Sequence, residues 1–319
     1  MIYLEMYGRA GNQLFRYATA RAIQHKYYPN EEIVINFQQV EEEHKVDSTY
    51  INILDDFCVS EYKKYDGKDK PIKKESSFIQ KLIGGVYYIG LRKFAPDQMN
   101  EQYKYQMKWH KILNWVGIYW YRTGYIPLTK SKAKNKFLSG NFESPEYFEE
   151  IKNIIKKEFR TNHELVTKNQ ELYSIIQSSN SICVSVRRGD FMSNDQKYED
   201  IKKLHGICKS DYFVSAIERA KELVDNPTFI MFSDDIEWVK NNIKADVPTY
   251  YEDGTDEIWE KLRLMSMCKH FILSNSTFSW WAQYLSDNEN KIVICPDRWF
   301  NNDYISPLIE KDWIKITLR

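Results

Sequence analysis

The second half of the chain alternates short apolar strands with amphipathic helices, and this alternation constrains the fold more than any other feature. The apolar runs have the length and the β-branched content of buried strands, and the segments between them repeat apolar residues with helical spacing. Such alternation is typical of a parallel sheet covered by helices on both faces. We predict strands at 182–186, 228–232, 270–273 and 291–295, and helices at 211–224, 256–267 and 278–285.

The first half also begins as an α/β domain. Its first residues predict a β-loop-α-β unit, made of a strand at 2–6, a tight loop at 8–11, a helix at 14–26 and a strand at 32–36.

A domain junction is expected near the middle of the chain. The segment 60–128 is irregular and aromatic, and we expect helices and loops there. Turn residues at 139–146 then precede an amphipathic helix expected at 147–159. Because 319 residues suffice for two domains, we predict an N-terminal α/β domain at 1–145 and a C-terminal domain at 146–319. The cleft between two such domains is a natural substrate site.

The composition is that of a globular protein, 43% hydrophobic and 28% charged. Lys+Arg and Asp+Glu are equal at 45 each, so no overall positive charge indicates a nucleic-acid partner. The five cysteines are scattered without C-x-x-C spacing, which argues against a disulfide framework and against a zinc site. Neither a signal-peptide pattern nor a run of about 18 uncharged apolar residues is found, so we expect a cytoplasmic protein.

Charge is uneven along the chain. The segment 60–136 contains 17 Lys and Arg against 6 Asp and Glu, interleaved with Trp and Tyr. One interpretation is a solvated basic face. The other is peripheral attraction to an anionic membrane, at its inner face, or to a lipid-linked acceptor.

The strand at 182–186 ends in two arginines, a glycine and an aspartate. Open α/β sheets bind ligands at the carboxyl ends of their strands, so Arg187 and Arg188 are placed for a ligand. Guanidinium groups bind phosphate through paired hydrogen bonds. Gly189 allows a sharp turn or a close backbone approach, and Asp190 can orient an arginine. An ion-paired loop without a ligand is the alternative.

Two further loops follow strands at the same predicted edge. Ser233, Asp234 and Asp235 follow one strand, and the segment 274–279 follows another and leads into Trp280 and Trp281. Together with the arginines they predict a nucleotide site, with carboxylates for ribose or base and hydroxyls and helix amides for phosphate. The alternatives are local: one aspartate caps a helix, and the tryptophans belong to the core. The adjacent aspartates do not predict a metal, because the arginines already neutralise a diphosphate.

The assembled motifs resemble those of the bacterial α-1,2-fucosyltransferases of glycosyltransferase family 11. The likeness runs nearly end to end and is weakest in the middle of the first half. It rests on GRAGNQLFRYA at 8–18, GNFESPEYF at 140–148, RRGDF at 187–191, MFSDDIEW at 231–238, and LMSMCKH at 264–270 followed by SNSTFSWW at 274–281.

The resemblance implies a two-domain GT-B-like glycosyltransferase with GDP-fucose in a Rossmann-like C-terminal domain. It places Arg187 at the β-phosphate, where it stabilises departing GDP, and Arg188 in support of the nucleotide site. Asp234 or Asp235 would contact guanosine. The remaining implied contacts are Ser276, Thr277 and Phe278 at the phosphates or base, and Asn12 and Gln13 at the fucose and acceptor.

Two positions depart from the family pattern. The arginine loop of relatives often reads His-x-Arg-Arg-Gly-Asp, and here the histidine position is Ser185, whose hydroxyl cannot act as a base near neutral pH. Glu143 stands where relatives tend to have glutamine. Asp190 and Glu143 are therefore the candidates for a general base, although Asp190 serves equally well to orient an arginine.

The implied reaction is an inverting transfer of L-fucose from GDP-β-L-fucose to the 2-hydroxyl of a galactose-terminated glycan. We expect no cofactor and no metal, because the arginines supply the positive charge at the diphosphate. Two alternatives stay open. One is a glycosyltransferase with another GDP-sugar or linkage, and the other is a nucleotide- or glycan-binding protein without catalysis.

Overall fold

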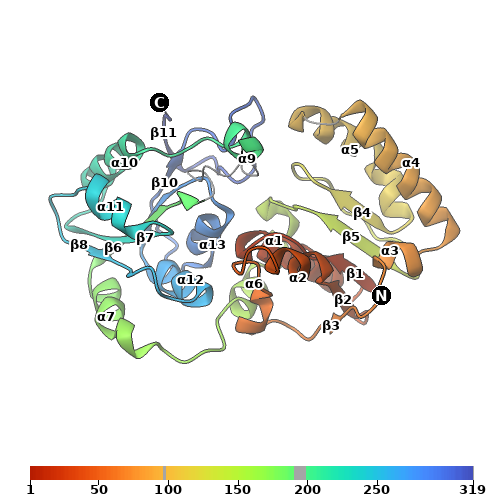
Figure 1. Ribbon diagram of the computed structural model, residues 1–319, viewed down its shortest axis with the longest axis horizontal. Coiled ribbons are helices and arrows are strands. Elements are labelled where there is room, and N and C mark those ends of the chain that lie inside the picture. Colours follow the sequence, from red (N-terminus) through yellow and green to blue (C-terminus); the bar gives the residue numbers. More distant parts are fainter. Residues whose placement is uncertain (96–97, 190–198, 319) are drawn as a thin grey trace. The chain divides into compact units, whose positions relative to one another are not determined.

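The computed structural model describes residues 1–95, 98–189 and 199–318 (Figure 1). The chain divides into two compact units, Met1–Phe159 and Arg160–Arg319. Each unit is built on its own parallel sheet. None of the described helices is long and apolar enough to cross a membrane.

Unit 1 contains a five-stranded sheet in the order β3-β2-β1-β5-β4, and every neighbouring pair of strands is parallel. The central strand β1 is buried because its apolar side chains meet helices on both faces of the sheet. The elements are β1 (Ile2–Glu5), α1 (Ala10–Tyr27), β2 (Ile33–Asn36), α2 (Gln38–His44), η1 (Ile53–Asp56), β3 (Lys63–Lys64), α3 (Pro71–Lys74), α4 (Phe78–Phe94), α5 (Met99–Trp115), β4 (Ile118–Tyr121), β5 (Lys136–Gly140), η2 (Pro145–Tyr147), η3 (Glu149–Ile151) and α6 (Lys152–Glu158).

The boundary between the units follows residue 159 and not residue 145, because the segment after the expected junction packs on unit 1. The ring of Phe159 lies 5.7 Å from that of Tyr17 and 6.0 Å from that of Phe57. Glu158 accepts a hydrogen bond from the Tyr17 hydroxyl at 2.8 Å and forms an ion pair with Arg21 at 2.8 Å. These contacts hold α6 against α1.

Three local predictions in unit 1 need correction. The segment 60–128, where helices and loops were expected, also contains strands β3 and β4. Helix α1 begins at Ala10, inside the loop expected at 8–11, because Gly8 alone makes the turn with φ +77°. The helix expected at 147–159 is broken into the turns η2 and η3 before α6. Phe148 interrupts it with a backbone φ of −134°. Its ring is fully buried and points toward the ring of Phe15, and the two ring centres lie 5.9 Å apart.

Unit 2 contains a six-stranded parallel sheet in the order β11-β10-β9-β6-β7-β8. Helices α10 and α11 lie on one face, and α7, α12 and α13 lie on the other (Figure 1). The elements are η4 (Thr167–Asn169), α7 (Gln170–Ser178), β6 (Asn180–Val186), α9 (Glu199–Leu204), α10 (Ser210–Leu223), β7 (Pro227–Ser233), α11 (Ile236–Asn242), β8 (Thr249–Tyr251), α12 (Ile258–Met267), β9 (His270–Leu273), α13 (Thr277–Leu285), β10 (Val293–Pro296) and β11 (Ile314–Ile316).

The alternation predicted for the second half is confirmed. The four predicted strands are β6, β7, β9 and β10, and the three predicted helices are α10, α12 and α13. Alternate residues of β6, Ile182, Val184 and Val186, pack with Phe213 and Ile217 of α10 in one apolar cluster. The sequence did not predict the edge strands β8 and β11, because both are three residues long and only partly buried.

Candidate nucleotide-binding and active site

The carboxyl ends of three strands lie side by side in unit 2. β6 pairs with β7 on one side, Val186 opposite Ser233, and with β9 on the other, Ser185 opposite Leu273. The loops after these strands therefore start at one edge of the sheet, where open α/β sheets bind ligands. This edge carries the residues predicted for the nucleotide: Arg187, Arg188, Asp234, Asp235 and the segment 274–279.

The carboxylate of Asp234 organises this edge. One of its oxygens accepts a hydrogen bond from Nη1 of Arg187, and the other accepts the backbone N–H of Arg188 at 2.8 Å. Both partners keep exposed surface, 27% for the Arg187 side chain and 26% for that of Asp234. An exposed guanidinium that a carboxylate orients is suited to bind a phosphate.

Gly189 leaves the space that Asp234 occupies. A Cβ atom at position 189 would lie 2.5 Å from Oδ2 of Asp234, closer than side-chain atoms approach one another, and 3.4 Å from Nη1 of Arg187. The glycine of the motif therefore permits the close approach of this carboxylate, and a close approach is one of the two roles that the sequence left open.

Arg188 is anchored within the protein. Its Nε donates to Asp235 at 3.1 Å, and its guanidinium lies 3.5 Å from the centre of the Trp238 ring. Asp235 also caps α11 by accepting the backbone N–H of Trp238 at 3.2 Å. The capping interpretation of one aspartate is thus confirmed. Sequence reasoning missed Trp238, although its place three residues after the cap was the available signal.

The N-terminus of α13 adds a second anion-binding feature. Ser276, Thr277 and Phe278 are partly exposed there. A helix N-terminus presents backbone N–H groups and the positive end of the helix dipole, which favour a phosphate. Trp280 and Trp281, which follow, are fully buried, so they belong to the core as the alternative interpretation predicted.

A second group of predicted residues lies in unit 1 around Glu143. Asn12 of α1 donates its side-chain amide to Oε1 of Glu143 at 3.3 Å. Burial raises the pKa of Glu143 to about 6, against the opposing effect of the positive charge of Arg16. A carboxylate with such a pKa is ionised at neutral pH and is basic enough to accept a proton. The structure thus brings Asn12 and Glu143 together.

Strained backbone and a buried arginine fix this group. Phe142 has φ +53°, which is unusual for a bulky residue, and its ring is buried. Arg16 is only 1% exposed and donates to the carbonyl of Tyr7 at 2.8 Å and to the side chain of Asn141 at 3.1 Å. Sequence reasoning missed Arg16. Its place one helical turn after Asn12 could have indicated it.

The side chain of Gln13 is buried and hydrogen-bonded to the backbone. It is 0% exposed, and its amide nitrogen donates to the carbonyls of Gly8 and Ile51, both at 2.8 Å. Its amide oxygen accepts the backbone N–H of Ile53 at 3.3 Å. These bonds tie the loop before α1 to the segment at η1, and the side chain has no surface to offer a substrate.

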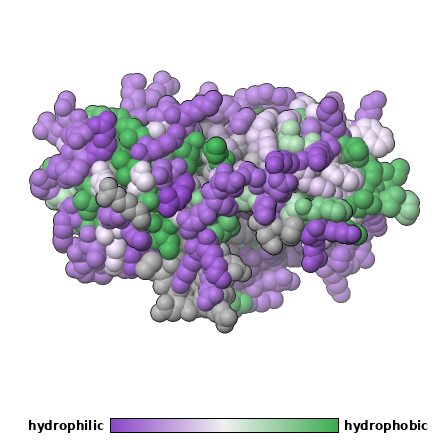
Figure 2. All heavy atoms as spheres, turned by 90° about the horizontal axis from the view of Figure 1, so that it is seen from above, coloured by the Kyte–Doolittle hydropathy of each residue, from purple (hydrophilic) through white to green (hydrophobic). Residues whose placement is uncertain are grey.

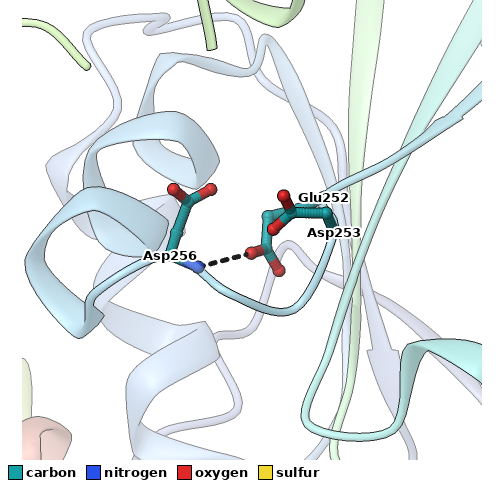
Figure 3. Close-up of side chains that lie close together, drawn as sticks. All are labelled: Glu252, Asp253 and Asp256. Atoms are coloured by element: carbon teal, nitrogen blue, oxygen red, sulfur yellow. Dashed lines mark hydrogen bonds between the residues drawn. The ribbon is translucent and has the colours of Figure 1, made fainter. Parts of the chain in front are cut away.

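Three acidic side chains of unit 2 form a cluster that the sequence did not reveal. Among the described residues, oxygens of Glu252, Asp253 and Asp256 lie within 4.8 Å of one another (Figure 3). Lys168 lies 2.9 Å from Asp256 and 3.4 Å from Asp253, and Lys261 lies 3.6 Å from Glu252. Glu252 also accepts the N–H of Asp256 at 3.2 Å, the dashed line in Figure 3. The lysines offset much of the charge, so we assign the cluster to closing the loop before α12.

Comparison with known families identifies the chain. The sequence model of glycosyl transferase family 11 matches residues 94–317, which is more than half of the chain. The chain belongs to this family. The match includes every residue of unit 2 described above and Glu143 of unit 1, and it confirms the resemblance on which the predicted roles were based.

Relatives of family 11 differ in the sugar that their names state. An alpha-1,2-colitosyltransferase of Escherichia coli is 35% identical over 56% of this chain and 61% of its own length. The O-antigen biosynthesis glycosyltransferase WbnK of Escherichia coli is 27% identical over 99% of this chain and 100% of its own. Human galactoside alpha-(1,2)-fucosyltransferase 1 is 27% identical over 48% of this chain and 43% of its own. The matched region thus spans less than two thirds of the first and third relatives.

Solved structures show the fold of this family 11 member. The crystal structure of NodZ alpha-1,6-fucosyltransferase co-crystallized with GDP matches with a TM-score of 0.51 at 14% identity, over 89% of this chain and 92% of NodZ. NodZ soaked with GDP-fucose matches with a TM-score of 0.50 at 13% identity, over 93% and 94%. The predicted GT-B-like α/β architecture with two domains is confirmed.

The histidine position of the family 11 loop is part of the core here. Ser185 is 7% exposed, and its hydroxyl lies 2.6 Å from that of Ser279, which in turn lies 3.4 Å from that of Ser274. These contacts join β6 to the start of α13. Asp190, the other predicted catalytic residue of this loop, lies outside the described residues.

Proposed function

We propose that this family 11 protein transfers L-fucose from GDP-β-L-fucose to the 2-hydroxyl of a terminal galactoside, with inversion to an α-1,2 linkage. The observation that carries the proposal is the guanidinium of Arg187, which Asp234 orients at the sheet edge from which the loop before α13 also starts. Both features bind phosphate oxygens. The name of the human relative, a galactoside alpha-(1,2)-fucosyltransferase, supports the sugar and the linkage.

In the proposed donor complex, the diphosphate lies between Arg187 and the first turn of α13. Arg187 binds the β-phosphate, and the exposed residues Ser276, Thr277 and Phe278 border the phosphates or the base. Arg188 acts indirectly, because Asp235 and Trp238 hold it. Asp234 is a positioning residue for Arg187, and the exposed part of Asp235 is available to guanosine.

The proposed chemistry places negative charge on the leaving group. The acceptor oxygen forms a bond to the anomeric carbon while the bond from that carbon to the β-phosphate oxygen breaks, and its electron pair leaves with GDP. Arg187 and the helix N-terminus stabilise that charge, and one such preorganised group is typically worth a factor of about a hundred or more in rate. These groups supply the positive charge without a metal ion.

We assign the acceptor proton to Glu143. Its pKa of about 6 suits a base at neutral pH, and Asn12 orients one of its oxygens. Asn12 and Glu143 would therefore face the acceptor and the fucose. Gln13 does not enter this proposal, because its side chain is committed to the backbone. Asp190 remains the second candidate for the base.

Transfer of colitose from a GDP-linked donor is the second candidate function, and the identity of 35% to the colitosyltransferase favours it.

The test of both candidate functions measures GDP release with GDP-fucose, GDP-colitose or GDP-mannose as donor and a panel of β-galactosides as acceptors. We expect the highest kcat/KM with GDP-fucose and an α-1,2-linked product by NMR. Preference for another donor would overturn the choice of fucose. Binding of every donor in thermal shift without GDP release would favour a protein without catalysis.

The proposal also includes the place in the cell where the protein acts. We place the protein in the cytoplasm, where it would act on a glycan or on a lipid-linked acceptor and contact the membrane peripherally. The surface for that contact follows from a separate part of unit 1.

A further inference from the structure

Helix α4 exposes a continuous apolar stripe. Five of its side chains share one face of the helix. Four of them are spaced three or four residues apart, and the fifth immediately precedes the first of these. Figure 2 shows green hydrophobic surface gathered at the right-hand edge, where α4 lies in Figure 1. The members and their exposed fractions are Phe78 79%, Ile79 54%, Leu82 56%, Val86 51% and Ile89 68%.

The opposite face of α4 is fastened to unit 1 along its length. Gln80 donates to the carbonyls of Val116 at 2.7 Å and of Asn135 at 2.8 Å, and it closes a capping box with Ser77. Further along, the Tyr87 hydroxyl donates to the carbonyl of Trp120 at 2.8 Å. Because this face is already packed, the apolar stripe remains outside the core of its own unit.

The surroundings of the stripe are positively charged. Helix α4 contains Lys81, Arg92 and Lys93 and no Asp or Glu. Beside the helix lies a cavity of about 480 Å³ with aromatic walls. Four cations line it, namely Lys70, Lys73, Lys81 and Arg122, against one carboxylate, Glu5. Within the part of the chain that the structure describes, no ion pair engages the side chains of Lys73, Lys81 or Arg122.

We infer that α4 lies in the surface of an anionic membrane, with the apolar stripe among the acyl chains and the cations at the headgroups. An exposed apolar face flanked by basic residues is the pattern of an interfacial helix. A second copy of this chain fits the stripe less well, because α4 against α4 brings the same cations together, whereas anionic lipids neutralise them. The inference does not depend on the sugar or the linkage proposed above.

Vesicle sedimentation of the full-length protein tests this surface. We expect it to sediment with phosphatidylcholine vesicles that contain about one third phosphatidylglycerol, and about tenfold less with pure phosphatidylcholine or in about 0.5 M salt. Leu82→Glu and Ile89→Glu should each weaken binding about tenfold or more. The matched control is Leu165→Glu, a substitution at a leucine of unit 2 that is 64% exposed, which should bind as the wild type does.

A charge series tests the second part of the surface. Arg92→Glu combined with Lys93→Glu should weaken binding to anionic vesicles about tenfold, and Lys45→Glu, at an exposed lysine distant in sequence, should not. Circular dichroism and GDP release with a soluble acceptor should be unchanged in all these variants, which separates this surface from the transfer reaction. The inference would be overturned if the wild-type protein does not bind anionic vesicles, or if Leu82→Glu binds them as well as the wild type does. A dimer in gel filtration that Leu82→Glu abolishes, without vesicle binding, would assign the stripe to a second copy instead.

Discussion

Asp234 orients the guanidinium of Arg187 across the ends of two adjacent strands. The same carboxylate accepts the backbone N–H of Arg188, so it also fixes the loop that carries the arginine. The contact joins the end of β7 to the end of β6. Because Arg187 is oriented before the proposed reaction, little free energy is needed to reorganise it when negative charge develops on the leaving group.

Replacement of Arg187 tests the leaving-group assignment. Arg187→Ala should lower kcat about a hundredfold or more with little change in the free energy of unfolding, because the side chain is partly exposed. Arg187→Lys should recover little, since an ammonium lacks the planar fork. Arg219→Ala is the control, at an arginine in a surface ion pair on α10. Normal turnover by folded Arg187→Ala would refute the assignment.

Gly189→Ala tests the role of Asp234 without removing a charge. The new Cβ must displace a carboxylate oxygen 2.5 Å away, and with it the orientation of Arg187. We expect kcat to fall about tenfold while the free energy of unfolding changes by less than about 1 kcal/mol, because only the end of one side chain moves. Kinetics and urea unfolding measure the two effects. Unchanged kcat would show that the pair does not set the rate.

The pH dependence of the reaction tests Glu143 as the base. Only the ionised carboxylate accepts a proton, so kcat should rise through a pKa of about 6 and level off above it. Glu143→Gln should lower kcat strongly and remove this inflection. If Glu143→Gln keeps the inflection of the wild type, the base lies elsewhere, and Asp190→Asn is the next variant to measure.

The raised pKa of Glu143 also predicts a change in stability. A carboxyl whose pKa is higher in the folded than in the unfolded state binds its proton more tightly when folded, so stability falls as the pH rises through about 6. From the usual value of 4.5 to about 6, the loss is at most about 2 kcal/mol. Glu143→Gln should therefore unfold at higher urea than the wild type at pH 8, but not at pH 4.

Ser185→Ala tests whether the histidine position of the family loop has a catalytic role here. The substitution removes a buried hydrogen bond to Ser279, which costs about 1 kcal/mol, and leaves Ser274 beside Ser279. We expect kcat to stay within about threefold of the wild type, since a hydroxyl is no base at neutral pH. A hundredfold lower kcat in folded Ser185→Ala would instead indicate a catalytic role for Ser185.

Metal removal tests the charge supplied at the diphosphate. We propose that Arg187 and the N-terminus of α13 provide it, so turnover after treatment with EDTA should equal that of untreated protein, and added Mg²⁺ should not raise it. Asp253→Asn, in the acidic cluster of unit 2, serves as a further variant and should keep full activity. Loss of activity with EDTA and recovery with Mg²⁺ would contradict the expected metal independence.

Much of the C-terminal fold could be predicted because its signals are local. Apolar runs such as Phe229 to Phe232 end abruptly in polar residues, and parallel strands place those ends at one edge. Edge strands such as β8 could not be predicted, because short and partly exposed strands lack this contrast. The end of unit 1 could not be located either, since it depends on where Phe159 packs.

The sequence by itself determined the alternation of strands β6, β7, β9 and β10 with helices α10, α12 and α13, the polar residues that follow those strands, and the family. Only the tertiary structure decided that Asp234 orients Arg187, that Trp238 lies under Arg188, that Gln13 is committed to the backbone and that α4 leaves an apolar stripe exposed. The physical reason is the separation along the chain over which each kind of interaction acts. Periodicity and capping act between neighbours in the chain, whereas ion pairs, burial and desolvation depend on residues that folding brings together.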